Sequence, residues 1–200
     1  MRDPENIGRV CELKPEFIGF IFYRGSKRYV GDKPDATIFA IPGRETGKVG
    51  IFVNEEISIV MQAAEEYHLD LVQLHGDESP EYCRKLDIAG IPVIKVLNPN
   101  TILEGQSHLD YETHARYLLF DTPGKELGGT GRKFDWDLLD GSSVSCPFFL
   151  SGGIGPKDSR AIREIEHPAL FGVDVNSKFE LAPGIKDTVL LERFMQELRV

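Results

Sequence analysis

Residues 48–74, KVGIFVNEEISIVMQAAEEYHLDLVQL, contain the pattern that decides the fold. Lys48 to Val53 is an apolar run of strand length, and Glu55 to Tyr67 carries apolar residues at the spacing of a helix. A second apolar run, Leu71 to Leu74, follows after a short turn. The order strand, helix, strand indicates a right-handed unit with two parallel strands.

The same alternation extends along all 200 residues. Near-continuous apolar runs are typical of parallel strands covered on both faces, and no GxGxxG motif of a dinucleotide-binding fold follows the first run. We therefore predict an α/β fold, a (β/α)8 TIM barrel that forms one domain over residues 1–200. Seven strands are visible: Phe17–Tyr23, Lys48–Val53, Leu71–Leu74, Pro92–Leu97, Tyr117–Phe120, Phe148–Leu150 and Leu170–Val175.

The chain opens with a predicted helix, whereas a (β/α)8 barrel opens with a strand. Asp3-Pro4 is a typical helix start, and Lys14-Pro15 ends the segment. We expect the first barrel strand to be absent, which would leave two strand edges unpaired and favour self-association. The other expected helices are a loosely helical stretch at Asp35–Ile41, Glu55–Tyr67, one that starts at Ser79-Pro80, one that starts at Asp135, Pro156–Glu164 and Thr188–Leu198, while Ile102–Thr113 is a weaker connecting segment.

Composition excludes several functions. With 32 acidic and 23 basic residues the net charge is -9, and Arg24–Arg28 is the only concentrated basic stretch, so nucleic-acid binding is not expected. No apolar run approaches the roughly 18–20 residues of a membrane span, and no secretory signal is visible, so we expect a cytoplasmic protein. The three cysteines, Cys11, Cys83 and Cys146, form no metal-binding motif.

Polar residues and glycines gather where the predicted strands end, which is where barrel enzymes place their active sites. Asp121 is a candidate proton donor, although aspartates in this position are more often turn or cap residues. Gly152 and Gly153 could let the backbone approach a phosphate, or form an ordinary turn. Arg28 could clamp a carboxylate or be a solvated charge, and His75 could simply be a packed histidine.

Lys95 is a separate candidate because it lies within a predicted strand rather than at its end. Ile94 and Val96 flank it. We expect Lys95 to point into the barrel, where an unpaired charge would be costly, and to have an acidic or phosphate partner.

Six segments resemble phosphoribosylanthranilate isomerase, an enzyme of tryptophan biosynthesis, in order and spacing: GFIFYRGSKRYV, VGIFVNE, VQLHGDE, LLFDTPGKELGGTGRKFDW, LSGGI and FGVDVNSKFE. The resemblance covers nearly the whole chain, and the pairing of QLHG with FD…GGTG…FDW is its most specific part. It implies a cofactor-free isomerase that converts N-(5-phosphoribosyl)anthranilate to 1-(2-carboxyphenylamino)-1-deoxyribulose 5-phosphate.

The resemblance also implies residue roles. Asp121 would be the general acid that opens the ribose ring. The family's general base is a cysteine on the first strand, and Met1 to Asp3 resemble the end of that segment, while Cys11 falls on the apolar face of a helix. Lys178 stands where glycine is usual. The implied substrate contacts are Arg28 to the carboxylate, Gln73 and His75 along the substrate, Gly152, Gly153, Asn176 and Ser177 at the phosphate, and Asp174 at the sugar hydroxyls. Independently of the resemblance, Gly129 and Gly131 belong to a glycine-rich loop that could fold over a substrate or be merely a surface loop.

Two interpretations remain open. The natural protein is an active isomerase, or the chain is a catalytically impaired barrel that still binds anionic phosphosugars. For the 200-residue chain as written we expect poor turnover, because the segment with the general base is missing. A ribulose-phosphate epimerase would be expected to show metal ligands at matching strand positions, and an indole-glycerol-phosphate synthase a longer N-terminal extension; neither appears.

Overall fold

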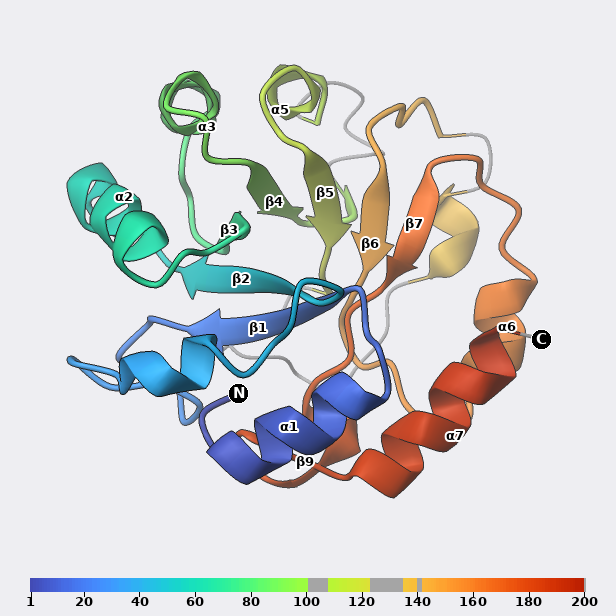
Figure 1. Ribbon diagram of the computed structural model, residues 1–200. Helices are drawn as coiled ribbons and strands as arrows, with labels where there is room; N and C mark the ends of the chain where they lie inside the picture. The colour runs from blue at the N-terminus through green and yellow to red at the C-terminus, as the bar shows by residue number, and fades with distance from the viewer. Residues whose placement is uncertain (101–107, 123–134, 140–141, 200) are drawn as a thin grey trace.

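The computed structural model describes residues 1–100, 108–122, 135–139 and 142–199. Its main feature is one curled sheet of seven parallel strands that follow one another in chain order (Figure 1). The strands are β1 (Phe17–Ile21), β2 (Gly47–Phe52), β3 (Leu71–Leu74), β4 (Val93–Leu97), β5 (Tyr117–Phe120), β6 (Phe148–Leu150) and β7 (Leu170–Val173). Because each connection leads to the adjacent strand, the sheet curls in one direction.

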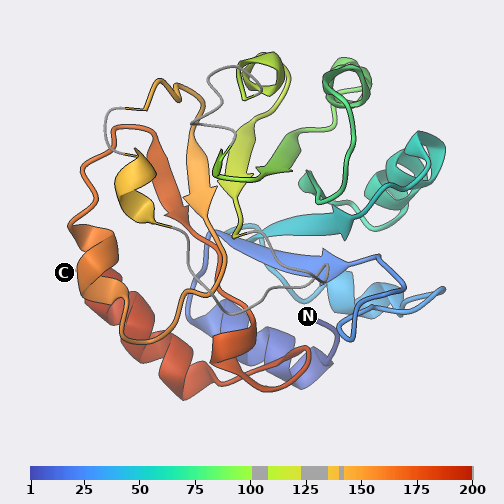
Figure 2. The same ribbon diagram turned by 180° about the vertical axis from the view of Figure 1, so that it is seen from behind.

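The helices lie outside the curl, as Figures 1 and 2 show from opposite sides. The α-helices are α1 (Pro4–Glu12), α2 (Ile57–Glu66), α3 (Pro80–Ile88), α5 (Leu109–Glu112), α6 (Ser159–Arg163) and α7 (Thr188–Leu198). The side chains of Asp3, Ser79 and Asp187 accept hydrogen bonds from backbone amides three residues later, which confirms the helix starts predicted at Asp3-Pro4 and Ser79-Pro80. None of the helices in the described part of the chain has the length and apolarity of a membrane span.

The described residues contain three short 3-10 helices, and the first two lie where weaker helices were predicted. They are η1 (Ala36–Phe39), η2 (Trp136–Leu139) and η3 (Ser177–Phe179). The helix expected from Pro156 starts later, at Ser159, because the Asp158 carboxylate accepts a hydrogen bond from the Gly155 amide at 2.7 Å and holds residues 155–158 in a turn. Of the segment expected from Ile102 to Thr113, only the part from residue 108 lies within the described residues.

Side chains on the inner face of the sheet form a core of their own. Val49, Leu71, Ile94, Tyr117, Leu119 and Phe149 pack together inside the curl. Successive residues of a strand point to opposite faces, so Ile94 inside the curl places Lys95 outside it. The prediction that Lys95 points into the barrel is therefore wrong. Its expected acidic partner is present: Glu78 lies 2.7 Å away, and the two side chains are each 2% exposed.

The sheet has two edges, β1 and β7, and the described residues show no backbone pairing between them. Aromatic rings span this gap at one end, with the centroids of Phe17 on β1 and Phe171 on β7 6.3 Å apart. The edge of β1 is partly covered. Its Gly19 carbonyl accepts a hydrogen bond from the Met1 amine at 2.5 Å, and its Ile21 carbonyl accepts one from the Val30 amide at 3.0 Å.

A hairpin that the sequence reasoning missed lies close to this gap. Its strands are β8 (Glu180–Ala182) and β9 (Ile185–Lys186), with β9 drawn between α1 and α7 in Figure 1. The Asn6 side chain on α1 exchanges two hydrogen bonds with the backbone of Lys186, at 2.7 and 2.8 Å. The hairpin is thereby fixed to the first helix.

Candidate active site

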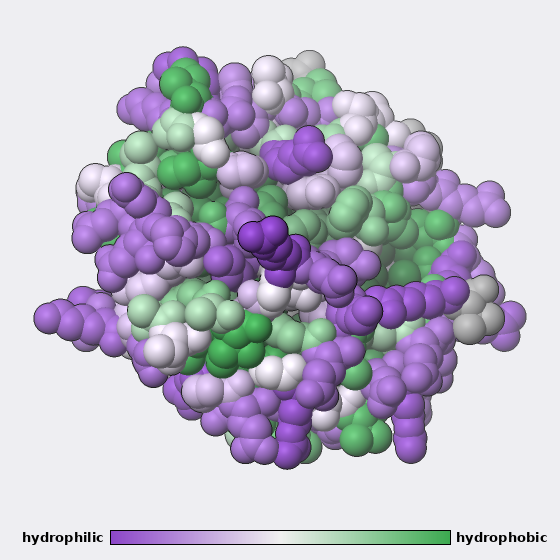
Figure 3. All heavy atoms as spheres, viewed as in Figure 1, coloured by the Kyte–Doolittle hydropathy of each residue, from purple (hydrophilic) through white to green (hydrophobic). Residues whose placement is uncertain are grey.

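One cavity of about 860 Å³ runs through the curl of the sheet and reaches the carboxyl ends of the strands. Figure 3 shows one face of the molecule, with hydrophobic residues in a recessed area to the right of its middle and hydrophilic residues around them. The cavity is lined by nine of the residues that sequence analysis selected: Arg28, Gln73, His75, Asp121, Gly152, Gly153, Asp174, Asn176 and Ser177. The other two, Gly129 and Gly131, lie outside the described residues.

Asp121 and His75 meet at the ends of β5 and β3. The Asp121 Oδ2 atom lies 3.2 Å from Nε2 of His75, and the Gln73 amide nitrogen lies 3.3 Å from Nδ1 of the same ring. Gln73 is 8% exposed and belongs to the inner face of β3. A carboxyl group, an imidazole and an amide thus form one row of neighbouring polar groups on the cavity wall, which can bind or transfer a proton.

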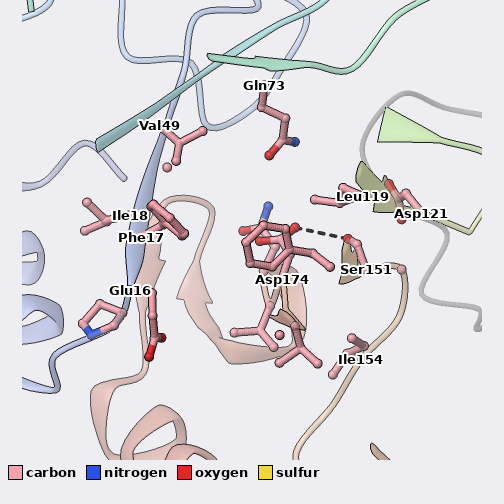
Figure 4. A pocket seen from close by; sticks show the side chains of 18 of the residues that line it. Glu16, Phe17, Ile18, Val49, Gln73, Leu119, Asp121, Ser151, Ile154 and Asp174 are labelled. Atoms are coloured by element: carbon pink, nitrogen blue, oxygen red, sulfur yellow. Dashed lines mark hydrogen bonds between the residues drawn. The ribbon is translucent and has the colours of Figure 1, made fainter. Parts of the chain in front are cut away.

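Asp174 directly follows β7 and projects into the same space as Gln73 and Asp121 (Figure 4). Its Oδ2 atom accepts a hydrogen bond from the Ser151 hydroxyl at 3.1 Å. The Asp174 side chain is open to the cavity, yet the protein around it removes much of the water that would solvate its charge, and this desolvation raises its pKa. The charge of Lys186 lowers that pKa, and the charge of Asp121 raises it further. Asp174 therefore holds its proton more tightly than an ordinary aspartate does.

Gly152 and Gly153 turn the chain sharply after β6. Both have positive φ angles, +85° and +69°, so each favours glycine. A Cβ atom on Gly152 would lie 2.3 Å from Oγ1 of Thr122, which shows how closely the loops after β5 and β6 approach each other. The exposed Lys178 donates a hydrogen bond to the Gly153 carbonyl at 2.7 Å. The two glycines and Lys178 form a polar corner where a small anion could bind.

Arg28 already has a partner in the structure. Its Nε and Nη2 atoms donate to the Glu180 carboxylate at 2.6–2.9 Å, a bidentate pair whose side chains are 15% and 4% exposed. Lys186 lies 3.5 Å from the same carboxylate and donates to Oδ1 of Asn176 at 2.8 Å. Burial raises the pKa of Glu180, but the hydrogen bond from Arg28 and the charges of Lys186 and Arg28 outweigh it and hold that pKa below its usual range.

Glu180 and Lys186 line the cavity, and sequence reasoning missed both. They are direct partners in the β8–β9 hairpin, so their side chains share one face. A signal for this hairpin was available. Ala182-Pro183-Gly184-Ile185 contains the Pro-Gly pair of a tight turn, and Gly184 has a φ of +86°.

Comparison with known proteins adds to this geometry. A family model described as N-(5'-phosphoribosyl)anthranilate (PRA) isomerase matches residues 1–197. The chain belongs to this family. The PRA isomerase of Parabacteroides distasonis is 43% identical over 199 residues, which cover 99% of this chain and 90% of that protein. The PRA isomerase of Phocaeicola vulgatus is 38% identical over 199 residues, which cover all of this chain and 95% of that protein.

Solved PRA isomerase structures have the same fold. The crystal structure from Thermotoga maritima superposes with a TM-score of 0.84 at 32% identity and covers 100% of this chain and 95% of its own. A second one, with a TM-score of 0.80, 30% identity and the same coverage, is a complex with reduced 1-(o-carboxyphenylamino)-1-deoxyribulose 5-phosphate. The predicted barrel fold, the isomerase assignment and its place in tryptophan biosynthesis are confirmed.

Proposed function

We propose that the cavity binds N-(5'-phosphoribosyl)anthranilate and promotes its Amadori rearrangement, with the residue roles that follow. The strongest support is that nine residues, chosen from motifs between positions 28 and 177, line one cavity. The ligand of the related complex carries an aromatic carboxylate at one end and a phosphate at the other. Arg28 and the Gly152–Gly153 turn are the corresponding polar groups of this cavity.

Asp121 is the general acid in this proposal. Ring opening needs a proton on the furanose oxygen as the bond from that oxygen to the first carbon breaks, and a carboxyl group at the cavity wall can supply it. His75 contacts Oδ2 of Asp121, so Oδ1 is the oxygen left for the substrate. Asp174, with its raised pKa and its Ser151 contact, is placed to hydrogen-bond the sugar hydroxyls.

The phosphate is assigned to backbone amides rather than to a helix end. The amide of Gly155 is already bound by Asp158, and α6 has only five residues. The turn at Gly152 and Gly153, with Asn176 and Ser177 opposite it, offers backbone donors that have access to the cavity.

Arg28 is assigned to the substrate carboxylate. Glu180 uses Nε and Nη2, so the Nη1 donors are those that the Glu180 pair leaves unused. In this arrangement Glu180 orients the guanidinium, and the substrate carboxylate binds its far side.

The central test is Asp121→Asn compared with Asp110→Asn, which neutralises an exposed carboxylate on α5 outside the cavity. We expect Asp121→Asn to lower turnover by about 10²-fold or more, because a general acid contributes about that much. Asp110→Asn should leave turnover unchanged. Loss of substrate fluorescence measures the rate, and calorimetric binding of reduced 1-(o-carboxyphenylamino)-1-deoxyribulose 5-phosphate shows that the site is intact. Equal rates in both variants would remove Asp121 from the mechanism.

A binding function without fast turnover is the second candidate. The next step of the rearrangement needs a base at the sugar's second carbon, and the described cavity lining contains no cysteine. We therefore expect the 200-residue chain to bind the reduced product analogue but to turn over more slowly than the Parabacteroides relative in the same assay.

Three wider expectations belong to the same proposal. Residues 1–200 form one barrel domain, an inference supported by the single seven-stranded sheet and by the family match over residues 1–197. The protein acts in the cytoplasm on a small phosphosugar, without a nucleic-acid or membrane partner. It self-associates through the open edge of β7.

A further inference from the structure

A buried ion pair lies behind the cavity wall. Lys95 on β4 and Glu78 before α3 are 2.7 Å apart, with both side chains 2% exposed. Both are absent from the cavity lining described above, so neither touches the substrate. We propose that this pair is a positioning device that holds His75 against Asp121. The proposal rests on the proposed function, which gives Asp121 its role.

The pair binds the backbone on both sides of His75. Lys95 Nζ donates to the carbonyls of Gly76 at 2.7 Å and of Leu74 at 3.4 Å. Glu78 Oε2 accepts a hydrogen bond from the Gly76 amide at 3.0 Å. Lys95 therefore holds the residue that precedes His75, and Lys95 and Glu78 together hold the residue that follows it.

The same carboxylate also fixes the neighbouring strand end. Glu78 Oε1 accepts a hydrogen bond from the Asn54 amide at 2.8 Å, and Asn54 has a left-handed backbone with a φ of +49°. A Cβ atom on Gly76 would lie 2.3 Å from Oδ1 of Asn54, so these two turns pack without room for a side chain. The His75 amide donates to the Phe52 carbonyl at 2.9 Å. The ends of β2 and β3 are thus held as one unit.

The fixed backbone sets the position of the His75 ring, and its neighbours set which ring nitrogen carries the proton. The amide nitrogen of Gln73 only donates, so Nδ1 of His75 accepts that bond and the neutral ring carries its proton on Nε2. Nε2 then lies 3.2 Å from Oδ2 of Asp121, with its proton on the atom nearest that carboxylate. A small shift of the Gly76 turn would move Nε2 out of reach.

Net stability is a poor explanation of this pair. Desolvation offsets most of the attraction between buried charges, and apolar replacements of such pairs are often neutral or stabilising. Four hydrogen bonds from Lys95 and Glu78 nevertheless reach backbone groups of residues 54, 74 and 76. This geometry suits a device that fixes a turn.

NMR of the His75 ring tests the proposal without relying on turnover. His75→Gln assigns the ring resonances, and Asp121→Asn should shift the Hε1 and Nε2 resonances of His75 because the two side chains are in contact. In the apolar double variant Lys95→Met/Glu78→Leu, most of that response to Asp121→Asn should be lost. Tyr111→Phe is the matched control: it removes a 3.1 Å bond to the Glu78 carbonyl but keeps the ring beside Lys95, so the response should stay complete.

The outcomes separate positioning from simple packing. A folded double variant whose His75 responds fully to Asp121→Asn would overturn the proposal, as would no response in the parent chain. If the double variant does not fold, Glu78→Gln replaces it; this variant keeps the shape but leaves one carboxylate bond unmade, and the expected loss is partial. A full response in that variant would equally refute positioning. Failure of the proposed function would instead appear in the turnover of Asp121→Asn.

Discussion

Gly152 is subject to two constraints, one on its backbone conformation and one on the space beside its Cα atom. Its φ of +85° disfavours any side chain, and a Cβ atom would also overlap the Thr122 amide, 2.5 Å away. Gly90 carries only the first constraint, because its φ is +76° and a Cβ atom added to it would meet no packed atom within 4 Å. The comparison of these two glycines separates backbone strain from overlap.

We expect Gly152→Ala to cost more free energy of unfolding than Gly90→Ala. The left-handed backbone alone costs about 1 kcal/mol, and overlap with packed atoms adds about 1–3 kcal/mol. Urea unfolding of both variants measures the difference, and binding of the reduced product analogue should weaken only in Gly152→Ala. Equal losses of stability would mean that Thr122 moves aside freely.

At the scale of elements, the β8–β9 hairpin connects parts of the chain that the sheet itself leaves unpaired. Glu180 on β8 binds Arg28, which follows β1, and Lys186 on β9 binds Asn176, which follows β7. The hairpin therefore crosses the gap between the two edge strands through side chains. Glu180 and Lys186 of the hairpin also line the cavity, so the fold and the site depend on the same contacts.

Glu180→Gln should destabilise the protein by about 3 kcal/mol, because it leaves a mostly buried guanidinium without its counter-charge. Glu5→Gln is the control: it breaks an exposed pair with Arg9 at the same 2.6 Å distance, with side chains 62% and 76% exposed, and should have no measurable effect. Urea unfolding measures both. Equal effects of the two substitutions would show that burial of the Arg28 pair is unimportant.

At the scale of the whole molecule, the curled sheet ends in two edges of different character. The edge of β1 is partly covered by Met1 and Val30, while Phe171 on β7 is 46% exposed. Open parallel edges offer unpaired backbone groups to other chains. The expected site of self-association is thus the edge of β7 rather than both edges.

We expect the sedimentation coefficient to rise with protein concentration. Phe171→Lys should reduce this association, because a charge on an edge strand opposes pairing. Since the Phe171 ring also packs against Phe149 inside the curl, circular dichroism of the variant must show an intact fold. Leu181→Lys, at a residue that is 72% exposed on the hairpin, should not. A chain that stays monomeric at every concentration, or equal effects of the two lysines, would contradict association through β7.

Sequence patterns predicted much of this fold and site because they depend on local spacing. Alternating apolar runs and helix caps such as Asp3 and Ser79 depend on neighbours only a few residues away. The strand ends placed Asp121 and Gly152 on one rim because the carboxyl ends of parallel strands meet there. These features follow from the repeat itself.

Other features were decided only by tertiary structure. Arg28 bonds with Glu180, 152 positions away, and no local pattern selects that partner. Lys95 points outward because the pairing register of β4 puts Ile94 inside the curl. A shift of β4 by one residue against its neighbours would have turned Lys95 inward and Ile94 outward. Asp158 takes the Gly155 amide that an anion would otherwise bind. Such choices depend on register and on how the sheet curls, which bring together residues that the local sequence leaves far apart.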